Sequence, residues 1–165
     1  MRAAVGDHRP WQVIVSSTLS RCAAFASDLA QRHALPLELD ARLMEIGFGE
    51  WEGRTAAEVT VQDPTLLKRF WSDPLNNVPP GAERMTAFRD RVIPAWDDIL
   101  ARHGGKHILI VGHAGVIRMV VRHVLDMPLD RVFRLTVPNA GITRIRVESD
   151  GGQALPTLLF HGGAL

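Results

Sequence analysis

Two groups of polar residues directly follow apolar, strand-like runs in this sequence. Two serines follow the run Trp11–Val15, and Arg21 comes soon after them, in the predicted first turn of a helix. A glycine and His113 follow the run His107–Val111 in the same way. A guanidinium binds phosphate oxygens bidentately at any working pH, and a protonated imidazole donates to them. Arg21 and His113 are therefore the candidate residues of an anion site.

The placement of these groups supports the prediction, although each residue has an ordinary structural interpretation. Parallel α/β sheets bind ligands at the carboxyl ends of their strands, where helix N-termini offer free backbone N–H groups. A single Arg in a first helical turn is usually solvated, and a single His after a strand usually packs or caps. The turn Gly112–Gly115 lacks the glycine spacing and the acidic partner of a dinucleotide loop, and Ala114 stands where a nucleophile elbow needs Ser. A nucleotide-binding domain is therefore the weakest alternative.

The apolar periodicity predicts an α/β fold for a single domain over residues 1–165. We expect a three-layer αβα sandwich with a mostly parallel sheet and an antiparallel edge hairpin. The predicted strands cover residues 11–15, 37–39, 107–111, 142–147 and about 155–160. The predicted helices cover residues 20–33, 64–71, 82–103 and 116–125, with Pro94 inside the longest and a capping box of Thr55 and Glu58 before a further one.

The composition narrows the class of protein. Of the 165 residues, 46% are hydrophobic and 22% are charged, and the net charge is +1, so we expect neither nucleic acid nor a membrane as the partner. The N-terminus lacks the pattern of a secretion signal, and no apolar run is long enough to span a bilayer. The single cysteine, Cys22, excludes an internal disulfide and is typical of a cytoplasmic protein. We interpret Cys22 as a packed helix residue.

Four motifs in order resemble the histidine phosphatase superfamily, which is phosphoglycerate-mutase-like. They are SSTLSR at 16–21, LMEIGFGEWEG at 43–53, PPGAER at 79–84 and IVGHAGVIR at 110–118. Within the family, residues 20–23, 70–74 and 129–145 look most like the α-ribazole phosphatase branch. The resemblance covers nearly the whole chain.

The resemblance implies a phosphomonoesterase that acts on a small phosphorylated metabolite through a phosphohistidine intermediate. In that mechanism Arg21 holds the phosphate, His113 is the second histidine that stabilises the transferring phosphoryl group, and Glu45 is the general acid. The resemblance implies no metal and no cofactor. Glu50, Glu52 and Glu83 are expected at the pocket rim or in structural roles. A mutase-type phosphotransferase and a non-catalytic homologue that binds phosphorylated ligands remain open.

The sequence departs from the family at its N-terminus. The nucleophilic histidine of the family lies in an Arg-His-Gly motif after its first strand, and no strand-like run of the printed sequence is followed by this motif. His8 and Arg9 have the reverse order with no glycine, and residues 1–5 resemble the end of the first helix of the family. We therefore expect an N-terminally truncated domain that lacks the first strand, is inactive alone and forms a homo-oligomer. We place the missing strand between residues 13–15 and 108–111. Thr18 and Ala114 are milder departures, from Pro and Gly.

Overall fold

Three parallel strands form the first sheet of the molecule. In the computed structural model, which describes residues 10–150 and 153–163, β1 (Val13–Ser17) lies between β2 (Leu37–Asp40) and β3 (Ile108–Val111). Both pairings are parallel, so the carboxyl ends of the three strands lie at one edge. Every residue of β1 is buried, as expected for a central β-branched strand.

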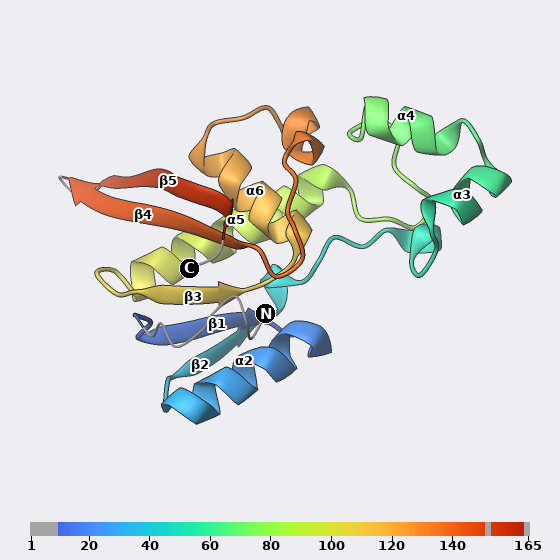
Figure 1. Cartoon of the computed structure of the whole chain (residues 1–165). Coiled ribbons are helices and arrows are strands. Elements are labelled where there is room, and N and C mark those ends of the chain that lie inside the picture. The colour runs from blue at the N-terminus through green and yellow to red at the C-terminus, as the bar shows by residue number, and fades with distance from the viewer. Residues whose placement is uncertain (1–9, 151–152, 164–165) are drawn as a thin grey trace.

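Two hydrophobic clusters cover the two faces of this sheet. Ile14 belongs to the cluster of α2 (Ser20–His33), and its neighbour Val15 belongs to the cluster of α5 (Met85–Arg102) and α6 (Ala114–Val124). Successive side chains of a strand point to opposite faces, so this division places helices on both sides of the sheet. Figure 1 shows α2 on one side and the other two helices on the other. The predicted three-layer α/β fold is confirmed.

An antiparallel hairpin forms a second sheet. It consists of β4 (Ile142–Asp150) and β5 (Gln153–Gly163), both longer than the sequence predicts. Ile145 and Val147 of β4 pack against the same cluster as α5 and α6. The hairpin therefore shares a core with the three-stranded sheet, although it is not hydrogen-bonded to it within the described residues.

An arm of two short helices projects from the body of the molecule (Figure 1). It contains α3 (Ala56–Gln62), which begins with the predicted capping box, and α4 (Leu66–Ser72). Three short 3₁₀ helices complete the described part of the chain: η1 (Ala41–Leu43) and η2 (Gly49–Trp51) precede the arm, and η3 (Leu129–Arg134) follows α6.

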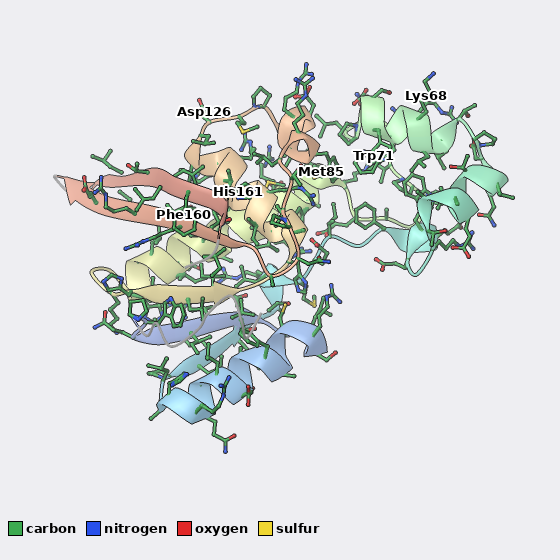
Figure 2. All side chains as sticks on the ribbon, viewed as in Figure 1. Lys68, Trp71, Met85, Asp126, Phe160 and His161 are labelled. Carbon is green, nitrogen blue, oxygen red and sulfur yellow. The ribbon has the colours of Figure 1, made fainter. Side chains whose placement is uncertain are left out.

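Aromatic rings connect the arm to the body. The ring centroid of Phe70 in α4 lies 5.4 Å from that of Trp51 and 5.3 Å from that of Phe133. The ring centroids of Trp71 and Phe133 are 5.2 Å apart. Figure 2 shows Trp71 at the end of α4 that faces η3. Aromatic contacts of this kind stabilise by about 0.5–1.5 kcal/mol each beyond the area that they bury. The cluster therefore fixes the position of the arm.

The missing strand was expected to leave a gap between β1 and β3, and this gap does not exist. The two strands pair directly, from Val13 opposite Ile108 to Ser16 opposite Val111, so no further strand fits between them. The break in the sheet lies instead between β3 and β4. The expectation was wrong because strand order depends on pairing between distant segments, which no local pattern encodes.

Three helix starts also differ from the prediction, and the first is that of α4, which begins at Leu66 rather than at residue 64. The long helix begins at Met85 rather than at residue 82, because Gly81 has a φ of +70° and Ala82 donates its N–H to Pro79 in a turn. The helix after β3 begins at Ala114, two residues earlier than expected. Over the described ranges, no helix is both long and apolar enough to span a bilayer. The expected helix end at residues 1–5 and the His8–Arg9 pair lie outside the described residues.

Candidate active site

The register of the sheet brings the two predicted phosphate-binding residues together. Ser16 lies opposite Val111, so the segments that follow β1 and β3 leave the sheet side by side. Arg21 is the second residue of α2, and His113 is the N-cap residue of α6. Arg21 Nε donates to His113 Nδ1 at 3.2 Å. Two residues that are 92 positions apart in the sequence thus meet as predicted from the strand ends.

The hydrogen bonds of His113 define its tautomer. A guanidinium can only donate, so Nδ1 of the imidazole accepts from Arg21 and the proton lies on Nε2. Nε2 lies 2.8 Å from Ser17 Oγ, which also accepts from the backbone N–H of Leu19. His113 is therefore a neutral donor held in a fixed orientation between the two strand ends.

Burial keeps His113 neutral. Its exposed fraction is 6%, and this desolvation, together with the positive charges of Arg21 and Arg91, lowers its pKa to about 4. At neutral pH the imidazole is therefore uncharged, and its one N–H faces Ser17 Oγ. A bound phosphate dianion would favour the protonated form, so anion binding and proton uptake are linked at this residue.

Cys22 lies against the same imidazole. Its Sγ is 3.5 Å from His113 Nε2 and donates weakly to the Gly112 carbonyl at 3.4 Å. Burial raises the pKa of the Cys22 thiol, although the charge of Arg21 opposes that rise. The side chain is 2% exposed, so the structure agrees with the interpretation of Cys22 as a packed helix residue.

Glu45 is bound to the N-terminus of α6. Its Oε2 accepts from the backbone N–H of Gly115 at 3.1 Å, and its Oε1 accepts from the backbone N–H of Ile46 at 3.0 Å. A carboxylate in this position interacts favourably with the helix dipole. A Cβ on Gly115 would lie 2.2 Å from Glu45 Oε1, so this contact requires glycine. The same helix thus begins with His113 and holds Glu45.

Arg91 of α5 holds the loop that carries Glu45, and the sequence analysis missed it. Its guanidinium binds both carboxylate oxygens of Glu83, at 2.7 and 2.8 Å. It also donates to the carbonyls of Arg42, Met44 and Glu45, at 2.7, 2.8 and 3.1 Å. These carbonyls lie more than forty positions away from Arg91 in the sequence, and no local motif predicts such contacts.

The three other acidic residues that were expected near the pocket differ in their contacts. Glu52 accepts from the backbone N–H of Phe48 at 2.7 Å, Glu50 is exposed, and Glu83 pairs with Arg91. Glu52 and Glu83 therefore support the backbone, as predicted. Ala114 is the first residue of α6, whereas Gly115 is the position that contacts Glu45. The departure at Ala114 therefore leaves the close contact of the helix with Glu45 unaffected.

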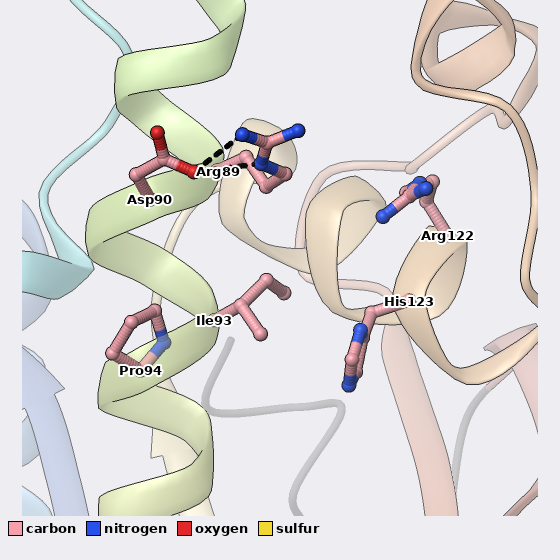
Figure 3. A pocket seen from close by; sticks show the side chains of 6 residues that line it. All are labelled: Arg89, Asp90, Ile93, Pro94, Arg122 and His123. Atoms are coloured by element: carbon pink, nitrogen blue, oxygen red, sulfur yellow. Dashed lines mark hydrogen bonds and ion pairs between the residues drawn. The ribbon is translucent and has the colours of Figure 1, made fainter.

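An open hollow of about 250 Å³ lies elsewhere, between α5 and α6 (Figure 3). Its lining includes Arg89, which pairs with Asp90, and Arg122, whose Nε donates to the Met127 carbonyl. None of the predicted site residues lines it. Among the described residues, no group of three His, Cys, Asp or Glu side chains is arranged to hold a metal ion.

Comparison with known proteins identifies the family. A model of the histidine phosphatase superfamily (branch 1) matches residues 2–157. The chain belongs to this superfamily. The structure is similar to that of Bacillus stearothermophilus YhfR, with a TM-score of 0.83 and 29% identity over 96% of this chain and 77% of that one.

Curated relatives of this chain are longer proteins. The chain is 33% identical to the "bifunctional protein Rv2228c" of Mycobacterium tuberculosis over 86% of its own length, but it spans only 39% of that relative. It is 28% identical to the adenosylcobalamin/alpha-ribazole phosphatase of Salmonella typhimurium, over 79% of this chain and 64% of that one. Phosphatases are thus among its relatives.

Proposed function

We propose that this chain carries the phosphate-binding and proton-donating half of a phosphomonoesterase that acts on a small phosphorylated metabolite. The observation that carries the proposal is the convergence at the N-terminus of α6. There His113 is the N-cap residue, Arg21 donates to His113, and the N–H of Gly115 holds Glu45. Catalysis of phosphoryl transfer depends on positioning and on charge stabilisation, and these groups provide both.

Each group has a defined task in the proposed reaction. A nucleophilic imidazole attacks phosphorus, and the bond from phosphorus to the ester oxygen breaks. Arg21 and His113 donate to the phosphoryl oxygens, while protonated Glu45 gives its proton to the leaving alcohol. Water then attacks the phosphohistidine, releases inorganic phosphate and restores the imidazole. Substrates of the α-ribazole-5′-phosphate type are favoured, because the resemblance to that branch agrees with the relative from Salmonella.

We propose that the nucleophile is a histidine other than those that the structure describes. Among the described histidines, only His113 interacts with Arg21 and Ser17, and its role in the proposal is that of the second histidine. We therefore expect the 165-residue chain to have little phosphatase activity by itself.

The test compares this chain with a version extended at its N-terminus by a strand that ends in Arg-His-Gly. Both are assayed with an aryl phosphate at pH 6–8. Activity in the extended protein alone, lost in Arg21→Ala and in His113→Ala, supports the proposal. Comparable activity in the 165-residue chain would contradict it, because another residue would then be the nucleophile.

A non-catalytic phosphate-binding role is the second candidate. It is favoured by Arg21, which is exposed and uses only its Nε in the contact with His113, so its terminal nitrogens can bind an anion. Calorimetry with inorganic phosphate tests this role. Binding to an extended protein that still shows no turnover would favour it over the phosphomonoesterase.

A further inference from the structure

The hollow between α5 and α6 combines basic side chains with an apolar wall. Two helices contribute its lining: Arg89, Asp90, Ile93 and Pro94 from α5, and Arg122 and His123 from α6. Figure 3 shows Ile93 pointing into the space between the helices, with Arg122 and His123 on the facing helix. The volume of about 250 Å³ equals that of about eight water molecules and is below the size of most pockets for drug-sized ligands. The hollow therefore suits a small ligand.

The charges that line the hollow do not cancel. Arg89 pairs with Asp90 at 2.6 Å, so the positive charge of Arg122 is left over. Arg122 is half-buried, and within residues 10–150 and 153–163 it forms no ion pair with a carboxylate. The exposed imidazole of His123 adds a donor to the same wall. Because a guanidinium that is partly removed from water without a counter-ion is destabilising, an anion would be favourable in the hollow.

The guanidinium of Arg122 is held in place by one of its three nitrogens. Its Nε donates to the Met127 carbonyl, which leaves the two terminal nitrogens for other acceptors. A cation in the last turn of a helix commonly binds the last carbonyls of that helix. Here the backbone N–H groups of Asp126 and Met127 already donate to the carbonyls of His123 and Arg122, at 3.2 and 2.9 Å. The terminal nitrogens of Arg122 are therefore not needed for capping, and such a pair binds carboxylate or phosphate well.

The wall formed by α5 offers an acceptor and apolar surface. Pro94 lies inside this helix and has no N–H, so the Asp90 carbonyl lacks the donor that an α-helix supplies four residues later. Both residues line the hollow, together with the half-buried side chain of Ile93. A hydroxyl group of a ligand can donate to this carbonyl while the carbon atoms of the ligand contact Ile93. The two walls thus complement a molecule that has an anionic head and a hydroxyl group.

We propose that the hollow between α5 and α6 binds a small hydroxylated organic anion, whose carboxylate or phosphate head pairs with the terminal nitrogens of Arg122. The hydroxyl group of the ligand donates to the Asp90 carbonyl, and its carbon atoms lie against Ile93. The inference does not rest on the proposed function. The bound ligand bridges the helix that carries Arg91 and the helix that follows His113, so it joins two elements on which the candidate active site is built.

The test uses two probes that differ in their head groups. 3-Hydroxy-3-methylbutyrate carries a carboxylate, and glycerol 3-phosphate carries a phosphate. Each is titrated into the 165-residue chain at pH 7, and backbone amide NMR shifts are followed over residues 89–93 and 122–123. Sodium chloride at the same ionic strength is the control for screening. The variants are Arg122→Met in the hollow, Arg21→Ala at the candidate phosphate site, and Arg32→Met, a matched exposed arginine of α2.

We expect saturable shifts at these amides with at least one probe, and the probe that binds identifies the head group. Arg122→Met should weaken binding about 10- to 100-fold, as expected for lost hydrogen bonds to a charged group, whereas Arg32→Met and Arg21→Ala should change it less than about twofold. His123→Glu places a carboxylate in the hollow at an exposed position and should also weaken binding about tenfold, which keeps the test decisive if Arg122→Met does not fold. The proposal is overturned if neither probe gives saturable shifts at millimolar concentration, if sodium chloride gives the same shifts, or if Arg21→Ala alone abolishes them.

Discussion

Replacing Arg91 by Met should destabilise the fold more than any surface substitution on α5. The side chain is 24% exposed and makes five hydrogen bonds, two to Glu83 and three to carbonyls of the loop that carries Glu45. Methionine fills much of the same volume but donates nothing. The carboxylate of Glu83, itself 22% exposed, then loses its counter-charge, and the three carbonyls lose their donor.

The magnitude follows from these losses. Removal of one partner of a buried ion pair costs about 3–5 kcal/mol, and partial access of water to this pair reduces that figure. We therefore expect about 2–4 kcal/mol for Arg91→Met, including the lost contact with the Phe88 ring, 4.7 Å from the guanidinium. For a chain of this size such a loss lowers Tm by roughly 5–15 °C. Arg91→Lys keeps the charge but loses the fork geometry, so we expect an intermediate loss.

Urea unfolding at pH 7, followed by circular dichroism, measures the effect. The matched control is Arg89→Met on the same helix, since Arg89 pairs with Asp90 in an exposed position and its loss should change the free energy of unfolding by less than about 0.5 kcal/mol. The reasoning is refuted if Arg91→Met is as stable as the control. A large loss without faster amide exchange in residues 44–47 would also refute the specific claim that Arg91 holds this loop.

Three further outcomes follow from the site. The pKa of His113 is about 4 in the folded state and 6.5 in the unfolded state, so the unfolded state binds more protons as the pH falls below 6.5. The free energy of unfolding should therefore fall by about 2 kcal/mol between pH 7 and pH 5. Urea unfolding at both pH values measures this fall, and His113→Gln should remove the part that is due to His113. Gly115→Ala should displace the Glu45 carboxylate while changing stability by no more than about 1 kcal/mol, since the gain in helix propensity offsets the lost hydrogen bond. In the N-terminally extended protein, Gly115→Ala should lower kcat by about 10- to 100-fold for alkyl phosphates, whose leaving group needs a proton, and by less for activated aryl phosphates. Equal losses for both substrates would show that Glu45 is not the general acid. Cys22 should react with iodoacetamide at least 100-fold more slowly in the native protein than in urea at pH 8, and rapid native labelling would contradict its burial and raised pKa.

The elements with strong local signals could be predicted from the sequence. The apolar runs before Ser16 and Gly112 form strands, and the capping box at Thr55 begins a helix, because each signal lies within a few residues of the structure that it determines. The pairing of Arg21 with His113 was also predictable, since parallel strands with helices after them bring their carboxyl ends together.

Two features could not be predicted, for related reasons. The direct pairing of β1 with β3, and the break beside β4, are decided by contacts between segments far apart in the chain. The role of Arg91 depends on backbone carbonyls that accept its hydrogen bonds. Every residue has a backbone carbonyl, so the sequence does not show which carbonyls Arg91 contacts. The catalytic roles of Arg21, Glu45 and His113 stay predictions until activity is measured.

The N-terminus of α6 joins two parts of the site that are otherwise supported separately. On one side, His113 is the N-cap residue and contacts Arg21 of α2 and Ser17, the last residue of β1. On the other, the N–H of Gly115 binds Glu45, whose loop Arg91 holds from α5. A substitution that shifts α6 must therefore change phosphate affinity and proton donation together. A substitution at Arg91 loosens only the acid, so the two kinds of variant should separate affinity for phosphate from dependence on the leaving group.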